Sequence, residues 1–191
     1  MKILFVHQHM PGQYRELVRW LAAQGGHELV FLSQRGDVKI PGVHTLVYKA
    51  FHTPAKDGFG LAKDWEAAAG AGFGAVQAAQ KFEQEHGFRP DIILGHTGWG
   101  ELSFFKDLWP DVPIIGFFEY YYSMDGGMVG FDPEQPPGPH APYFNRARNV
   151  VPCLNREVVD LGHVPTYWQR DRFPASFHDK MYVCHDGIRA D

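Results

Sequence analysis

The chain has 191 residues, of which 45% are hydrophobic and 21% are charged. This balance is typical of a folded globular domain, and the length suits one domain with its own core. The formal net charge of −4 excludes the strongly basic surface on which nucleic-acid binding depends. No apolar run approaches the ~20 residues that a membrane span requires. These features predict a cytoplasmic protein and leave only peripheral contact with a membrane open.

The two cysteines, Cys153 and Cys184, are too few for a disulfide framework or a zinc site built from thiolates. They agree with a reducing compartment. Residues 1–7 turn polar too soon for a signal peptide and are interpreted as a first strand.

The first half of the chain alternates between strand and helix patterns. Continuous apolar runs predict strands that are covered on both faces, and amphipathic spacing predicts helices. The expected order is strand 3–6, a helix from 14 ended by Gly25-Gly26, strands 28–32 and 44–48, helix 63–86 with the stripe Trp65, Ala69, Phe73, Val76 and Phe82, and strand 91–94. This order predicts a Rossmann-like α/β fold, a parallel sheet with helices on both faces.

The second half continues the same alternation around a long loop. The expected elements are helix 99–108, strand 113–118, a Pro/Gly-rich loop 124–142, a helix from 143 with the stripe Val150, Leu154, Val158 and Leu161, strand 164–166, a turn or short helix 168–173, and strand 181–184. Pro152 is expected to kink or split the helix. A loop as long as 124–142 indicates function or mobility.

The first candidate site follows the first strand, because ligands of open parallel sheets bind beyond the carboxyl ends of strands. Gly12 allows close approach of a phosphate or sugar to the backbone, and Gln13 follows it. A plain strand-to-helix turn explains this segment equally well. His7 and His9 have no third ligand at a suitable spacing, so no metal is predicted.

The second candidate is the segment GHTGWGE, again directly after a strand. His96 can exchange a proton near neutral pH, and Thr97 and Gly98 are predicted to contact substrate. The alternative is that His96 only packs or caps locally.

The third candidate begins at Glu119, where an apolar strand ends in three tyrosines. Aromatic rings stack on sugar faces and a carboxylate accepts hydrogen bonds from hydroxyl groups. Glu119 is therefore predicted as catalytic with His96, and Tyr120 and Tyr121 as substrate-binding. The alternative is an ion pair of Glu119 with a surface arginine, beside tyrosines that only pack.

Several familiar motifs are absent or misplaced. The segment Gly70–Ala75 has the spacing G-x-G-x-x-A, but it follows a helical pattern rather than a strand, so its glycines are interpreted as helix packing and not as a dinucleotide site. The sequence has no phosphate-binding G-x-x-x-x-G-K-[ST], no nucleophile elbow and no D-x-D pair for a metal on a nucleotide diphosphate.

Four segments together resemble the N-terminal domain of family 4 glycosyltransferases: HQHMPGQY, PDIILGHTGWGE, GFFEYYY, and PTYWQRDRFP before HDGI. The resemblance covers nearly the whole chain. It implies half of a two-domain GT-B architecture, with residues 1–184 as the acceptor-side domain and 185–191 as the start of an interdomain linker. The donor-binding C-terminal domain would then be absent from the chain.

The resemblance also implies an activity. A nucleotide-sugar donor would be bound mainly by the other domain, and a retaining transfer would deliver a hexose to a saccharide or lipid-linked acceptor, as in the synthesis of cell-envelope polysaccharide. Gly12 corresponds to a glycine that approaches the donor, although many members have two there. Glu119 stands where many members have His or Asp. No metal or other cofactor is implied, and the isolated domain is predicted to be inactive.

Two other classes remain open. The chain could be a sugar- or nucleotide-binding module that acts by itself, or half of a nucleotide-sugar epimerase with the same two-domain architecture. A C-terminal half with a Glu-x7-Glu motif would favour the transferase.

Overall fold

The computed structural model describes residues 1–187, and residues 188–191 lie outside the described part. The predicted linker, 185–191, therefore falls partly outside it. All seven strands of residues 1–187 run parallel in one sheet, in the order β3-β2-β1-β4-β5-β6-β7. Their bounds are β1 Lys2–Val6, β2 Glu28–Ser33, β3 Val43–Val47, β4 Ile92–His96, β5 Ile114–Phe117, β6 Leu161–Val164 and β7 Met181–Val183.

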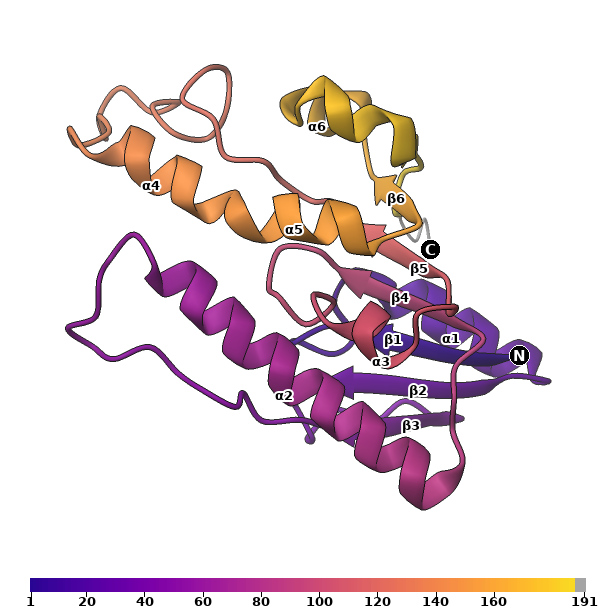
Figure 1. Ribbon diagram of the computed structural model, residues 1–191. Coiled ribbons are helices and arrows are strands. Elements are labelled where there is room, and N and C mark those ends of the chain that lie inside the picture. The colour runs from indigo at the N-terminus through magenta and orange to yellow at the C-terminus, as the bar shows by residue number, and fades with distance from the viewer. Residues whose placement is uncertain (188–191) are drawn as a thin grey trace.

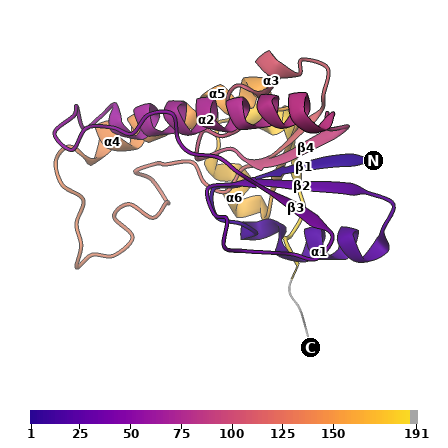
Figure 2. The same ribbon diagram turned by 90° about the horizontal axis from the view of Figure 1, so that it is seen from below.

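Helices cover both faces of the sheet, as the sequence predicts. Helix α1 lies on one face, and α2, α3 and α5 lie on the other (Figures 1 and 2). The helices are α1 Arg15–Gln24, α2 Lys63–His86, α3 Phe105–Leu108, α4 Ala141–Arg148, α5 Val150–Val158 and α6 Tyr167–Arg172, with 3₁₀ turns at Gly12–Tyr14 and Ala175–Lys180.

The two layers enclose two apolar cores. Phe5 and Phe31 pack with Val18 of α1 on one face of the sheet. Leu4 and Ile93 face the other core, which the alanines of α2 help to close. Neighbouring residues of β1 thus enter opposite cores, which is why its sequence is apolar without interruption. Full burial of one such side chain stabilises the fold by roughly 1.5–3 kcal/mol.

The predicted apolar stripe of α2 is mostly wrong. The residues that enter the core are small, namely Ala68, Ala71, Ala75 and Ala79, followed by Phe82. Trp65, Ala69 and Phe73 instead line an apolar surface groove of about 480 Å³. The 49–52 segment packs closely against α2 at two glycines. A Cβ on Gly70 would overlap the carbonyl oxygen of His52, and a Cβ on Gly74 would overlap that of Lys49. The interpretation of these glycines as packing residues, and not as a dinucleotide motif, fits this contact.

The second half departs from prediction at four places. Leu161, expected on a helix, begins β6, and Thr166, expected in a strand, caps α6 by accepting a hydrogen bond from the backbone N–H of Gln169 at 3.1 Å. The predicted helix 99–108 is helical only in α3, with turns before it. The split expected near Pro152 falls at Asn149, between α4 and α5. Pro152 is tolerated because it lies in the first turn of α5, where backbone N–H groups have no partner within the helix.

Candidate functional site

Loops from three adjacent strands meet at the carboxyl edge of the sheet. The strands β1, β4 and β5 are neighbours, so the residues that follow them come together. The rings of His7 and His96 lie edge to face with centroids 5.5 Å apart. His96 Nε2 lies 3.1 Å from Glu119 Oε2. The structure therefore brings His96 and Glu119 into contact, as the adjacency of their strands leads one to expect.

His96 is almost completely buried and has both ring nitrogens engaged. Its Nδ1 accepts a hydrogen bond from the backbone N–H of Gly98 at 2.9 Å, so Nε2 carries the proton and donates to Glu119. Glu119 keeps 57% of its side chain exposed. The hydrogen bond from His96 holds the pKa of Glu119 below its usual range, against the effect of partial burial. His96 thus positions an ionised carboxylate that faces the solvent.

Thr97 and Gly98 shape this loop. The Thr97 hydroxyl is buried and donates to the carbonyl oxygen of Phe117 at 2.9 Å, while the Thr97 carbonyl accepts from Asn155 Nδ2 at 2.6 Å. These bonds direct Thr97 into the loop and away from the solvent. A Cβ on Gly98 would lie 2.9 Å from the His96 ring, so glycine lets the backbone fold close over the imidazole.

The three tyrosines point in different directions. The Tyr120 hydroxyl accepts a hydrogen bond from the backbone N–H of Met128 at 2.6 Å, and its ring meets that of Tyr122 edge to face at 5.1 Å. Tyr121 instead packs against Phe173 and Phe177 beside the core, with centroids 5.4 and 5.8 Å away. The structure therefore separates Tyr121 from the other predicted substrate-binding residues. Tyr122, which was not predicted, lines the cavity instead.

The loop after β1 contributes Gly12 and Gln13. Gly12 has a φ of +51°, a conformation that side chains disfavour. A Cβ there would lie 2.9 Å from His7 Nε2. Gln13 is half-buried, and its Nε2 is buried without a hydrogen-bond partner among residues 1–187.

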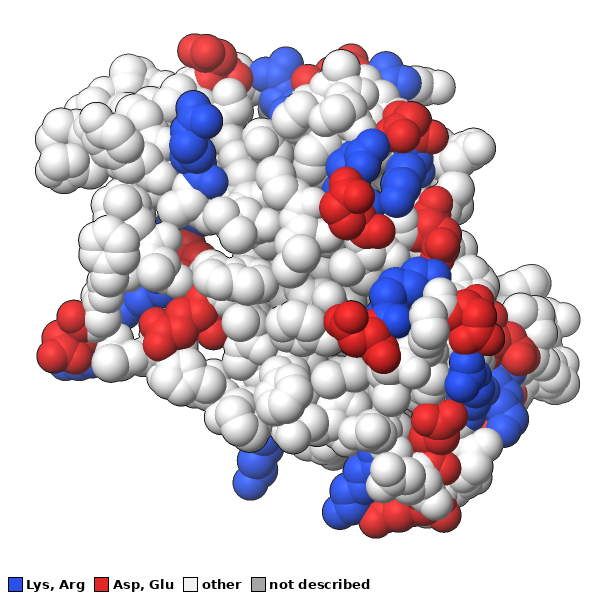
Figure 3. Space-filling view, in the orientation of Figure 1, with Lys and Arg blue, Asp and Glu red and all other residues white. Residues whose placement is uncertain are grey.

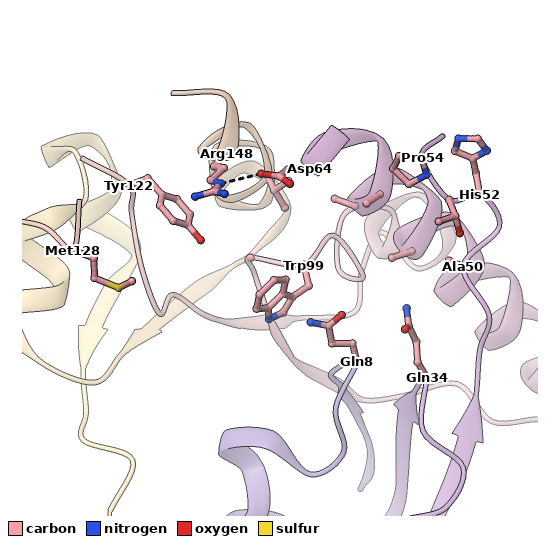
Figure 4. A pocket seen from close by; sticks show the side chains of 16 residues that line it. Gln8, Gln34, Ala50, His52, Pro54, Asp64, Trp99, Tyr122, Met128 and Arg148 are labelled. Atoms are coloured by element: carbon pink, nitrogen blue, oxygen red, sulfur yellow. Dashed lines mark hydrogen bonds and ion pairs between the residues drawn. The ribbon is translucent and has the colours of Figure 1, made fainter. Parts of the chain in front are cut away.

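Beside these loops lies a cavity of about 560 Å³ (Figure 4). Gln8 and Gln34 enter it from the ends of β1 and β2, and Trp99 forms part of its wall after β4. On the far side Arg148 of α4 bonds Asp64 of α2 at 3.0 Å.

Tyr122 joins this wall through two further contacts. The guanidinium of Arg148 lies 5.3 Å from the centre of the Tyr122 ring. Asn149, at the junction of α4 and α5, bonds both the N–H and the carbonyl of Tyr122, at 2.9 and 2.8 Å. The cavity therefore combines aromatic faces with polar groups, the composition that binds hydroxyl-rich molecules.

A buried chain of hydrogen bonds lies behind Gln34. Its Nε2 donates to the Tyr48 hydroxyl at 3.1 Å, which donates to Glu101 Oε1 at 2.7 Å. Glu101 is 1% exposed, and its Oε2 has no partner among the described residues. Burial raises the pKa of Glu101. This arrangement fixes Gln34 at the cavity wall.

Sequence reasoning missed most of the cavity. Asp64 and Arg148 lie on helices, 84 residues apart, and no local motif marks their pairing. Gln8 and Gln34 could have been found, because each lies just beyond the end of a strand.

The remaining surface gives two further facts. On the face in Figure 3, acidic and basic residues lie side by side. The ion pairs of the chain include Arg156–Asp179 at 3.1 Å and Arg148–Asp64 at 3.0 Å. In residues 1–187, no helix combines the length and apolarity that crossing a membrane demands.

Solved structures with a similar fold include glycosyltransferases and a UDP-GlcNAc 2-epimerase. The glycotransferase of kitacinnamycin is 16% identical with a TM-score of 0.57, and the chain covers 99% of itself and 52% of that protein. A UDP-glucose:anthocyanidin 3-O-glucosyltransferase in complex with UDP is 13% identical, with a TM-score of 0.58 and coverages of 99% and 53%. The UDP-GlcNAc 2-epimerase of Neisseria meningitidis bound to UDP-GlcNAc is 13% identical, with a TM-score of 0.52 and coverages of 96% and 45%.

The chain thus spans about half the length of these proteins, and its fold is one half of the GT-B architecture. Residues 25–191 match the model of the glycosyl transferase family 4 group. The chain belongs to this family, and the resemblance inferred from its sequence is confirmed. No curated protein matches it. The loop after β1 precedes the matched residues.

Proposed function

We propose that the chain is the acceptor-side domain of a retaining glycosyltransferase. This enzyme would move a hexose from a nucleotide-sugar donor to a saccharide or a lipid-linked saccharide. A second domain would hold the nucleotide. Membership of the family and the GT-B fold support the transferase class. The finer proposal depends on the site.

The observation that carries it is the exposed Glu119 carboxylate held by buried His96. Transfer of a sugar builds positive charge at the anomeric carbon and negative charge on the departing phosphate. A carboxylate fixed before the reaction stabilises that positive charge without reorganisation. The low pKa of Glu119 favours its ionised form, so it acts by charge and not by giving a proton.

The neighbouring cavity is the proposed acceptor site. Trp99 and Tyr122 offer ring faces to a sugar, while Gln8, Gln34 and Arg148 offer hydrogen bonds to its hydroxyl groups. Gly98, Trp99, Tyr122 and Arg148 also line a smaller hollow of about 50 Å³ that Glu119 borders. An acceptor in the cavity would therefore lie beside the reacting sugar.

The test is turnover by the full-length protein. UDP-glucose and UDP-GlcNAc are supplied with methyl glycosides or lipid-linked saccharides as acceptors, and released UDP is measured. We expect acceptor-dependent release, and NMR of the product should show the anomeric configuration of the donor. An inverted product would contradict the retaining mechanism.

Two results would favour the other classes. One of the solved structures with a similar fold is an epimerase, so epimerase activity is the first alternative to test. A 2-epimer of the sugar nucleotide, formed without any acceptor, would replace the transferase by an epimerase. Binding of sugars without any reaction of the full-length protein would favour a binding module.

A further inference from the structure

Two glutamines line the cavity at the ends of neighbouring strands, and only one of them has its side-chain amide held (Figure 4). Gln34 Nε2 donates to the Tyr48 hydroxyl at 3.1 Å. In residues 1–187 the side-chain amide of Gln8 bonds no group, and its backbone carbonyl oxygen accepts from Ser33 Oγ and from the N–H of Gln34. The two side chains therefore differ in rotational freedom, although they share residue type and position at the sheet edge.

The Tyr48 hydroxyl holds the Gln34 amide in one orientation. It has a single proton, which it donates to Glu101 Oε1 at 2.7 Å. Oε1 accepts this proton when the carboxyl group is ionised, and equally when it is protonated on Oε2. The Tyr48 oxygen is then left as an acceptor, so the amide must turn its NH₂ group toward it. A reversed amide would place two oxygen atoms against each other without a proton between them.

Burial strengthens the bond on which this orientation depends. Tyr48 and Glu101 are 2% and 1% exposed, so water does not compete for the hydrogen bond between them. Burial, and after it the Glu101 carboxylate, raise the pKa of Tyr48, so the hydroxyl keeps its proton. The backbone of Tyr48 is held as well, because its N–H donates to the Ser33 carbonyl oxygen at 3.0 Å. The orientation of the Gln34 amide is thus fixed before a ligand binds.

We propose that Gln34 is a specificity-determining residue of the acceptor site, and that Tyr48 and Glu101 are its positioning residues. With Nε2 turned to Tyr48, Gln34 Oε1 bonds no group of residues 1–187 and is presented to the cavity as an acceptor. Its partner is a hydroxyl group of the saccharide that donates a proton. A saccharide with hydrogen or fluorine in place of that hydroxyl leaves Oε1 unpaired and binds less tightly. This inference rests on the proposed function and adds selection by a single hydroxyl.

Binding of analogues to the full-length protein tests the direction of this hydrogen bond. Methyl α-glycosides of glucose, galactose, mannose and N-acetylglucosamine are screened by NMR, and the tightest binder is compared with its monodeoxy and monodeoxyfluoro analogues. Fluorine cannot donate a hydrogen bond. At one ring position we expect both replacements to weaken binding by about tenfold, the effect of one hydrogen bond. Fluoro analogues that bind as tightly as the glycoside at every position would overturn the proposal.

Three variants assign this effect to Gln34 and its neighbours. In Gln34→Ala the glycoside and the two analogues should bind equally, and a persisting difference would overturn the proposal. Gln8→Ala is the matched control and should leave the ratio of the two affinities unchanged. Tyr48→Phe keeps the ring but lets the Gln34 amide turn, so this ratio should fall toward one. When Gln34 is already alanine, Tyr48→Phe should change the affinity for the glycoside no further. Additive effects would show that Tyr48 supports only the fold.

NMR of the native protein without ligand gives a measurement that does not depend on the folding of any variant. NOEs should connect the NH₂ protons of Gln34 with the ring protons of Tyr48, and an NH₂ group turned away from Tyr48 would overturn the proposal. If a glycoside moves the indole signal of Trp99 but every analogue binds equally, this inference fails and the proposed acceptor cavity stands. If no glycoside moves any signal of the cavity, both fail.

Discussion

Glu119 presents an exposed carboxylate, and the buried side chain of His96 holds it in position. Solvent reaches the carboxylate, while the imidazole is fixed by the backbone N–H of Gly98. The carbonyl of Glu119 is held as well, by Gln169 Nε2 at 3.0 Å. An ionised group held at both ends is preorganised for electrostatic work.

Glu119→Gln should lower kcat of the full-length enzyme by roughly a hundredfold, because it removes the charge but keeps the shape. The melting temperature should change little, since Gln can still accept from His96 and an exposed substitution alters stability by under ~0.5 kcal/mol. Steady-state kinetics and thermal unfolding test both parts. Normal turnover with a large drop in melting temperature would show that Glu119 is structural.

His96→Phe should raise the pKa of Glu119, because the hydrogen bond that lowers it is lost. An acid with a depressed pKa stays ionised until the pH falls through that low value. The native enzyme should therefore keep its activity further into acid than the variant, whose acidic limb should move to higher pH. The pH profile of kcat/KM measures this shift. Equal limbs in both proteins would contradict a role of His96 through Glu119.

Glu101 should make the protein less stable as the pH rises. Burial raises its pKa above the ordinary 4.5, so the folded state binds a proton that the unfolded state has released. Well below pH 4.5 the carboxyl is protonated in both the folded and the unfolded state. As the pH rises from there toward the pKa of the folded state, only the unfolded state has lost its proton, and the free energy of unfolding falls. Glu101→Gln should thus raise the melting temperature at pH 8 by a few degrees, about 1 kcal/mol in a domain of this size.

The same substitution should have little effect at pH 4.5, where the native carboxyl is protonated as well. Glu85→Gln, on the exposed end of α2, is the matched control and should change neither value. A melting temperature lowered at pH 8 by Glu101→Gln would show that the ionised carboxylate stabilises the fold.

At the scale of elements, the packing of α2 depends on glycines that have no side chain where the 49–52 segment contacts the helix. Alanine normally stabilises a helix relative to glycine by about 0.5–1 kcal/mol. Gly74→Ala should instead destabilise the protein by roughly 1–3 kcal/mol, because the new methyl group overlaps the Lys49 carbonyl. Urea unfolding measures the difference. Gly138→Ala, where a Cβ meets nothing within 4 Å, should leave stability nearly unchanged, and a stabilised Gly74→Ala would refute the contact.

Strands β1 and β2 could be predicted from sequence because parallel strands buried on both faces are continuously apolar. The face of α2 could not, because periodicity gives most weight to large residues such as Trp65 and Phe73, whereas the contact with the 49–52 segment selects alanine and glycine. Leu161 was misplaced for a related reason, since an apolar spacing of three or four residues continues by chance from α5 into β6.

The site divides in the same way. His96 and Glu119 could be predicted to meet, because topology brings the ends of adjacent parallel strands together. Which of three successive tyrosines faces the cavity depends on packing against Phe173 and Phe177, more than 50 residues later in the chain. No local pattern contains that information.

At the scale of the whole molecule, the chain contains two complete hydrophobic cores. It nevertheless spans only about half the length of each solved structure with a similar fold. The 191-residue chain should unfold in one cooperative transition, because both cores pack against the same sheet. It should release only background UDP from UDP-glucose, since the proposed nucleotide-binding domain is needed for turnover. Calorimetry and a nucleotide-release assay test the two statements, and sustained turnover by this chain would refute the two-domain proposal.

The place of β1 in the sheet has a consequence for biosynthesis. In chain order β1 is the first strand of the sheet, and it lies between β2, which follows within 30 residues, and β4, which begins only at Ile92. Until that residue has been synthesised, one whole edge of β1 lacks its neighbour, and its unpaired N–H and carbonyl groups can join another chain. High contact order of this kind slows folding. During the interval between translation of β1 and β4, the nascent protein therefore exposes an unpaired strand edge through which it can aggregate.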